Sequence, residues 1–258
     1  MSNQADASID SIAKLLHVLA QITGDGHESW YRGHRDSSWR LQPSVLRSKE
    51  HREEERAMLA RFRQEAAVAG LPYTLDDWGW MVFAQHHELP TRLLDWSQSP
   101  LVGLYFACEP ANASESTAIE PDGEFFVLDP NMLNREAGDG DRGSPRLLCE
   151  ADERLKDYLP GNDSQNVSKP RAVVAPLAFD RIRFQSGTFT VSQSSLFQDE
   201  EKLRDSSALQ NFRVPGDKKR EIRAELNALG FNEAAIYRDL DRIARRIKQA
   251  ARGGKYAN

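Results

Sequence analysis

The sequence predicts an α+β protein with a single domain, in which helices flank a central mixed or antiparallel sheet. Three observations lead to this prediction: helical spacing of apolar residues near both ends, short aromatic and β-branched segments scattered between them, and no repeat or long low-complexity linker. The 258 residues, 40% of them hydrophobic, suffice for one large core.

The first part of the chain is predicted to be mainly helical. Apolar residues recur at helical spacing over Ser8–Ile22, and Trp30–Gly33 is a short aromatic segment typical of a strand. Glu50–Ala69 predicts a long charged helix. Its expected buried stripe consists of Met58, Leu59, Phe62, Ala66 and Ala69. Leu75–His86 and Pro100–Cys108 predict two more helices, the second with proline in its first turn.

The second part mixes strands and helices. Gly123–Asp129 is aromatic and β-branched and predicts a buried strand, whereas the acidic, glycine-bearing stretch Arg135–Pro145 predicts a mobile loop. A helix is expected around Glu150–Tyr158. Further strands are expected at Ala172–Leu177, Arg181–Phe184, Gly187–Ser192 and Asn211–Val214, and closing helices at Lys218–Leu229 and Asn232–Arg252.

Composition favours a soluble protein of a reducing compartment. The net charge is -5, and the two cysteines, Cys108 and Cys149, are too few for a disulfide framework. No segment approaches the eighteen or so uninterrupted apolar residues of a spanning helix, and the N-terminus lacks a signal-peptide pattern. We therefore expect a cytoplasmic protein without a membrane partner.

The last fifth of the chain is basic. Residues 202–258 hold 14 Lys and Arg against 7 Asp and Glu. A basic stripe can attract nucleic acid. Because this one falls on predicted helices whose other faces are apolar, a solvated face is the favoured interpretation, and nucleic-acid binding through the C-terminal helix is the less favoured one.

Residues 84–99, AQHHELPTRLLDWSQS, form the densest group of reactive side chains. Apolar helices flank this stretch, so its polar groups must find partners, either in an internal network, which composition slightly favours, or in the wall of a pocket. His86 and His87 are adjacent and lack metal-ligand spacing, so we expect no metal. His86 with Asp95 could serve as an acid/base pair, although no matched nucleophile motif accompanies them.

Arg32 follows an aromatic residue and precedes Gly33 at a predicted strand end. Glycine would let a phosphate approach the backbone, and the guanidinium could fork onto it. The more frequent arrangement is an ion pair with a buried carboxylate such as that of Asp95. The two usual phosphate-cradling loops, GxGxxG and GxxxxGK[ST], do not occur in the sequence.

Several motifs resemble the FRG domain family. They are Tyr31-Arg32-Gly33, Trp39 to Ser44, the block Gln85 to Ser97, the following Pro100 to Ala107, Gln185 to Phe189, Leu229-Gly230 and Asp239 to Asp241. The sequence departs from the family in His87 for an aromatic residue, Glu88 for glycine and Gly103 for alanine. Together with the helical spacing near the N-terminus, the resemblance predicts an N-terminal helix in residues 1–27, an FRG domain over 28–252 and a tail at 253–258.

The order of these motifs also resembles the arginine-serine-glutamate class of ADP-ribosyltransferases, which implies a split sheet and NAD as substrate. The resemblance implies that Arg32 grips the pyrophosphate, that Ser97, with Thr91 nearby, orients the ribose, and that Gln185 occupies the place of the glutamate. Glutamine cannot offset developing positive charge or take a proton. His86 is the candidate base or amide donor.

These roles define the candidate site residues. The expected catalytic residues are Arg32, His86, Ser97 and Gln185. The expected cofactor-binding residues are Tyr31, Arg32, Gly33, Thr91, Arg92 and Asp95, where Asp95 is either a catalytic carboxylate or, more in line with its surroundings, the ion-pair partner of an arginine.

Three functions follow from these patterns. The leading hypothesis is an NAD-using ADP-ribosyltransferase or NAD glycohydrolase acting as an effector in phage defence or a toxin system. The first alternative is a module that binds a nucleotide, nucleic acid or protein without chemistry. The second is a hydrolase or nuclease built on His86, His87 and Asp95.

Overall fold

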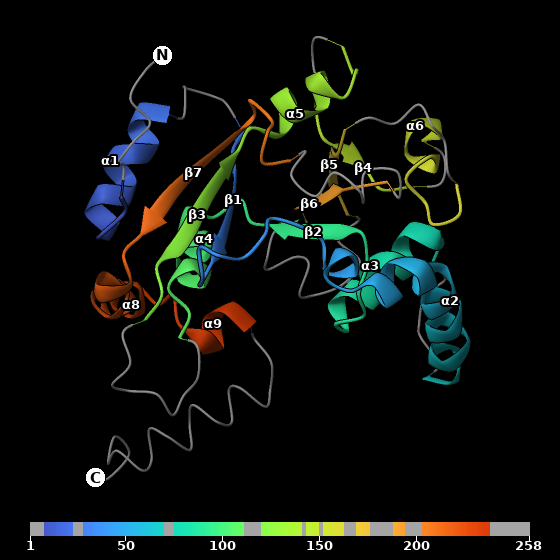
Figure 1. The fold of residues 1–258 in the computed structure, drawn as a ribbon, viewed down its shortest axis with the longest axis horizontal. Helices are drawn as coiled ribbons and strands as arrows, with labels where there is room; N and C mark the ends of the chain where they lie inside the picture. The colour runs from blue at the N-terminus through green and yellow to red at the C-terminus, as the bar shows by residue number, and fades with distance from the viewer. Residues whose placement is uncertain are drawn as a thin grey trace.

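The computed structural model contains two sheets with helices against them (Figure 1). It describes residues 8–22, 28–69, 75–110, 120–140, 143–149, 152–162, 169–175, 188–193 and 203–237. The first sheet has the order β1-β3-β7 and consists of Trp30–His34, Gly123–Leu128 and Leu209–Val214. The second has the order β2-β6-β5-β4 and consists of Leu93–Trp96, Thr188–Val191, Arg171–Val174 and Arg146–Leu147.

The sheets confirm the predicted α+β class, and the strands divide between two sheets. The first sheet is antiparallel, and the second is mixed because β4 pairs with β5 in parallel. Within the described residues one isolated bridge joins them: the Tyr31 N–H donates to the Ser97 carbonyl at 2.7 Å, and the Ser97 N–H donates to the Tyr31 carbonyl at 2.8 Å. This bridge lies between β1 and the residue that follows β2, so it brings the two principal sequence motifs together.

Helices surround both sheets (Figure 1). They are α1 Ile12–Ile22, α2 Lys49–Ala66, α3 Asp77–His86, α4 Pro100–Ala107, α5 Pro130–Glu136, α6 Glu153–Lys156, α8 Lys219–Ala228 and α9 Glu233–Tyr237. Three 3₁₀ turns, η1 Ser44–Arg47, η2 Ala67–Ala69 and η4 Gly216–Lys218, complete the described elements. Asp76 caps α3 by accepting from the Gly79 N–H, and Pro100 begins α4.

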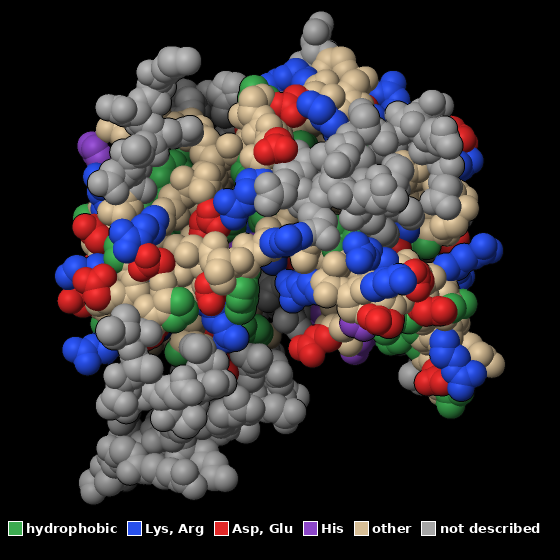
Figure 2. All heavy atoms as spheres, in the orientation of Figure 1, with side chains coloured by type: hydrophobic (Ala, Val, Ile, Leu, Met, Phe, Trp, Pro, Cys, Tyr) green, Lys and Arg blue, Asp and Glu red, His purple; other side chains and the backbone are tan. Residues whose placement is uncertain are grey.

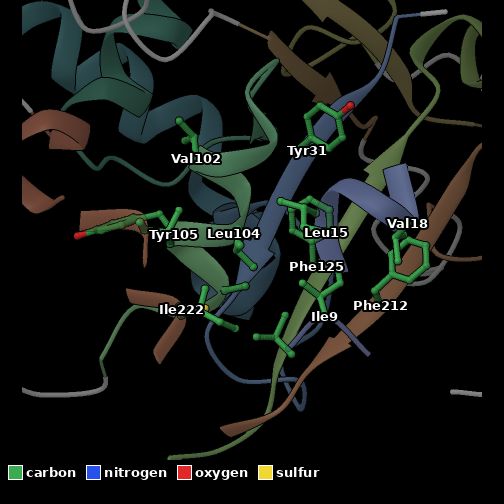
Figure 3. Packing of buried hydrophobic residues seen from close by; sticks show 14 of the residues in the cluster. Ile9, Leu15, Val18, Tyr31, Val102, Leu104, Tyr105, Phe125, Phe212 and Ile222 are labelled. Atoms are coloured by element: carbon green, nitrogen blue, oxygen red, sulfur yellow. The ribbon is translucent and has the colours of Figure 1, made fainter. Parts of the chain in front are cut away.

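Three hydrophobic clusters hold the elements together. One packs α1, α4 and α8 against the first sheet (Figure 3). A second packs α3 and α6 against the second sheet. The third contains Trp30, Leu94 and Phe126, so it combines residues of β1, β2 and β3 and joins the two sheets. The predicted N-terminal helix α1 therefore belongs to the same hydrophobic cluster as Tyr31 of the aromatic-Arg-Gly motif.

The face of the molecule shown in Figure 2 is mixed in charge. Basic and acidic side chains are interspersed over the described surface of the face shown in Figure 2. Among the helices of the described ranges, none combines the length and the apolar character that crossing a bilayer requires.

Some predicted elements differ from the structure. In the α2 stripe, Met58, Leu59, Phe62 and Ala66 are only half-buried, and Glu55 is the buried residue of this helix. The predicted mobile loop begins inside α5, and the side chain of Asp139 is 3% exposed because arginines surround it. The helix expected over 150–158 is limited to α6.

Other predictions lie wholly or partly outside the described residues. They are the strand at Arg181–Phe184, Gln185, and the part of the closing helix beyond Tyr237. The division into 1–27, 28–252 and 253–258 stays a prediction.

Candidate functional site

A cavity of about 380 Å³ lies where the two sheets meet. Its walls come from β1, η1, the C-terminal end of α3, the end of β2, α4, β6 and α9. Six predicted site residues line it: Tyr31, Arg32, Gly33, His86, Asp95 and Ser97. Arg32 and Ser97, which are far apart in the sequence, therefore border one cavity as the motifs implied.

Gly33 is required by the packing of β1 on α4. A Cβ atom at this position would lie 2.1 Å from the Gly103 carbonyl oxygen and 2.3 Å from the Ala107 nitrogen. Gly103 faces the strand in the same way, since its Cβ would lie 3.0 Å from that of Tyr31. Close helix–strand contact thus requires glycine at this position, and Gly33 also borders the cavity. Its approach to a ligand stays a prediction.

The Arg32 guanidinium is held by uncharged acceptors. Its Nη1 donates to the Asp95 backbone carbonyl at 2.6 Å, and its Nε donates to His34 Nε2 at 3.2 Å. Burial, and secondarily repulsion from Arg47, lowers the pKa of Arg32 to about 10, although Asp95 acts in the opposite direction. Where an ion pair between Arg32 and Asp95 was predicted, Arg32 forms a hydrogen bond to the backbone carbonyl of Asp95. The Asp95 carboxylate accepts a hydrogen bond from Gln85.

Arg47 is a second cation of the cavity, and the sequence patterns did not single it out. It ends the η1 turn, is exposed, and forms no hydrogen bond or ion pair with the residues that the structure describes. Its charge opposes protonation of both Arg32 and His34. The two guanidinium groups therefore create a positive potential that an anion would relieve.

His34 accepts a hydrogen bond from Arg32 and is not itself one of the residues that line the cavity. Its side chain is buried, and its ring packs against Phe126 with centroids 5.0 Å apart. Burial, followed by repulsion from Arg32, Arg47 and Arg204, lowers the pKa of His34 to about 3. The ring is therefore neutral at pH 7, which lets Nε2 accept the hydrogen bond from Arg32.

A chain of hydrogen bonds orients the Asp95 carboxylate. The Leu93 N–H donates to Thr91 Oγ1 at 3.2 Å, Thr91 Oγ1 donates to Gln85 Oε1 at 2.6 Å, and Gln85 Nε2 donates to Asp95 Oδ2 at 2.7 Å. Thr91 is fully buried and does not line the cavity. Its role is to position Gln85, a motif residue that the candidate set omitted.

Arg92 also lies outside the cavity. Its guanidinium pairs with the Glu55 carboxylate at 2.5 Å and donates to the Tyr158 carbonyl at 2.8 Å. Both charged side chains are 2–3% exposed. The structure therefore places Arg92 in an internal ion pair that anchors α2.

The Ser97 hydroxyl lies at the beginning of α4. It accepts from the Ser99 N–H at 3.0 Å, which leaves its own proton available to a ligand. His86 ends α3 at the cavity, and its ring contacts His87 with centroids 4.9 Å apart. The far wall is aromatic, where Phe106 and Tyr237 pack edge to face at 5.9 Å.

Glu88 is a further cavity residue that the candidate set omitted. It follows α3 with φ 63°, in the left-handed region that favours glycine. The signal for it was present, because the resembled family has glycine at this position.

The described part of the chain contains no cluster of side chains suited to bind a metal ion. No group of three or more His, Cys, Asp or Glu side chains there is arranged to hold an ion. Gln185 lies outside the described residues, so its place relative to the cavity is not given.

The fold and the cavity define an α+β protein with an arginine-lined cavity at the junction of two sheets. Residues 27–116 match the family model of the FRG domain. This match covers about a third of the chain, from β1 through α4, and it contains most of the cavity walls. Neither a curated protein nor a solved structure gives a match to the chain.

Proposed function

We propose that the cavity binds NAD and that the protein breaks its nicotinamide–ribose bond, passing ADP-ribose to an acceptor or to water. The observation that carries this proposal is the state of Arg32, a half-buried arginine whose guanidinium is bonded to a carbonyl and an imidazole while a second guanidinium, that of Arg47, acts on it. Withdrawing a cation from water without a bonded counter-charge is costly. Arginine pairs well with phosphate because its planar fork donates two parallel hydrogen bonds.

The remaining walls suit the other end of NAD. The nicotinamide ring is flat and positively charged, and the cavity offers the aromatic rings of Phe106 and Tyr237 together with the carboxylate of Asp95. The C-terminal end of α3 adds partial negative charge at the same wall. A volume of about 380 Å³ is near the lower end of small-molecule sites, so it suits part of a dinucleotide.

The proposed chemistry assigns a task to each group. Arg32 and Arg47 hold the pyrophosphate, and the Ser97 hydroxyl donates to a ribose oxygen. The bond from C1′ to the ring nitrogen breaks, and its electron pair leaves with nicotinamide. Positive charge then develops on the ribose, where a carboxylate stabilises it.

The test compares the wild type with Arg32→Gln for nicotinamide release and for the thermal shift caused by NAD. Loss of a charge-assisted hydrogen bond predicts about 10- to 100-fold weaker NAD binding. Arg61→Gln is the matched control, because Arg61 pairs with Glu65 on the exposed face of α2. Growth arrest on expression of the wild type but not of Arg32→Gln would support the effector role. A wild type that neither binds NAD nor releases nicotinamide refutes the proposal.

A nucleotide-binding module without chemistry is the second candidate. It is favoured by the internal bond that already engages Asp95 Oδ2. Such a module would be stabilised by a nucleotide, by about 2.7 kcal/mol at a hundred times its dissociation constant, without releasing nicotinamide.

A further inference from the structure

Three described helices, α3, α5 and α8, end in the same backbone arrangement. In each, the residue after the cap has positive φ, and the next N–H bonds to the carbonyl five residues earlier, which defines a Schellman motif. These bonds are Leu89 to Ala84 at 3.0 Å, Asp139 to Asn134 at 3.0 Å and Phe231 to Leu226 at 2.8 Å. The residues with positive φ are Glu88 at 63°, Gly138 at 91° and Gly230 at 86°.

Two of the three motifs use glycine for its backbone. A Cβ atom built on Gly138 or Gly230 meets nothing within 4 Å, so a larger side chain would find room at either position. Glycine therefore stands there because it adopts positive φ without steric cost. In the same position of α3, Glu88 bears that cost and is the non-glycine residue with positive φ in the described part of the chain. The backbone conformation therefore does not explain why glutamate occupies position 88, and we look for the reason in its side chain.

Glu88 is exposed to solvent, and its carboxylate is not engaged elsewhere. It borders the cavity, and within the described ranges its carboxylate has no hydrogen bond or ion pair. The other cavity carboxylate, Asp95, accepts from Gln85 and lies in the field of Arg32. Glu88 is thus the carboxylate that can turn toward a ligand without breaking an internal bond.

We propose that Glu88 is a catalytic carboxylate of this cavity, a step that rests on the proposed NAD chemistry. As the C1′–N bond breaks, nicotinamide leaves neutral with the electron pair, and Glu88 faces the positive charge on the ribose. Water or an acceptor hydroxyl then forms the new C1′–O bond, and its proton passes to the Glu88 carboxylate and on to solvent. In this way the chain supplies a carboxylate whether or not Gln185 reaches the site.

The experiment separates charge from backbone strain by comparing Glu88→Gln and Glu88→Gly. Glu88→Gln keeps the strained backbone and should lower kcat for nicotinamide release by about 100-fold, with the melting temperature and NAD affinity near wild type. Glu88→Gly should lower kcat equally and raise the melting temperature by about 2–4 °C, because glycine removes the left-handed strain. Glu88→Asp should restore part of the rate.

Gly230→Glu is the matched control, since it places the same side chain in the same motif at α8. It should lower the melting temperature by a similar amount and leave nicotinamide release unchanged. If Glu88→Gln turns over NAD at the wild-type rate, or loses only affinity, Glu88 is not catalytic although the proposed function stands. If the wild type itself neither binds nor cleaves NAD, both proposals fall.

Discussion

His34 links the cavity to the stability of the fold at the scale of one residue. Its neutral ring accepts the hydrogen bond from Arg32. Burial of the ring, together with repulsion from three arginines, holds its pKa near 3. An unfolded histidine titrates near 6.5. Between these two values the unfolded chain binds the extra proton, so the folded state loses stability as the pH falls.

This difference predicts a pH-dependent free energy of unfolding. The contribution of His34 is complete above pH 6.5 and is lost as the pH falls from there toward about 3, at up to about 1.4 kcal/mol per pH unit. His34→Gln offers a non-titrating acceptor to Arg32 and should flatten the slope between pH 6.5 and 5. Urea denaturation at several pH values measures it. Parallel slopes for the two proteins would mean that His34 is charged in the fold.

At the scale of elements, the contact between β1 and α4 sets the position of the Arg32 motif. Backbone meets backbone at Gly33, which lies against the Gly103 carbonyl, whereas Gly103 lies against side-chain atoms of Tyr31 and Phe125. At Gly33 no flexible side chain can move aside. The strand and the helix must therefore separate if Gly33 gains a side chain.

Gly33→Ala should destabilise the protein by about 3 kcal/mol, because its methyl group would lie 2.1 Å from a backbone oxygen. Gly79→Ala in α3 is the control, since its Cβ meets side chains at 3.1–3.2 Å and alanine favours a helix interior. Chemical denaturation should leave that variant within about 1 kcal/mol of wild type. Equal stability of the two variants would contradict the tight β1–α4 contact.

Local sequence signals were sufficient for much of this architecture. Asp76 and Pro100 mark the beginnings of α3 and α4, and the aromatic run at Trp30 marks β1, so these elements lie where predicted. The motif resemblance also predicted that Arg32 and Ser97 would share a cavity, and they do. These features depend on residues close in sequence or on a pattern spanning both segments.

Partners far apart in sequence could not be predicted in the same way. Glu55 belongs to a run of charged residues on α2 and has no local mark of burial, yet it pairs with Arg92. Arg47 likewise reaches the cavity because η1 is bonded to a distant residue just before β2, where the Val45 N–H donates to the Thr91 carbonyl. Periodicity describes one element at a time, so it does not indicate which charged residue a distant strand will cover.

At the scale of the whole molecule, the pair of Glu55 and Arg92 connects parts that are distant in the chain. Glu55 lies on α2, Arg92 immediately precedes β2, and the guanidinium also reaches the carbonyl of Tyr158 beyond α6. Glu55 Oε1 accepts from the Arg92 backbone N–H at 3.1 Å as well. Since β2 leads directly to Asp95 and Ser97, this buried network supports the wall of the cavity.

Removing one partner of the Glu55–Arg92 pair should therefore lower the free energy of unfolding more than removing both partners. Glu55→Gln leaves the Arg92 charge buried without a counter-charge and should lower the free energy of unfolding by about 3–5 kcal/mol. The double variant Glu55→Met with Arg92→Met removes both charges and should be more stable than Glu55→Gln, with about 1–3 kcal/mol still lost where the backbone N–H is unpaired. Urea denaturation of the three proteins tests this, with Glu65→Gln on the exposed face of α2 as the control. A Glu55→Gln protein as stable as the control would mean that water reaches the pair and that α2 is not anchored by it.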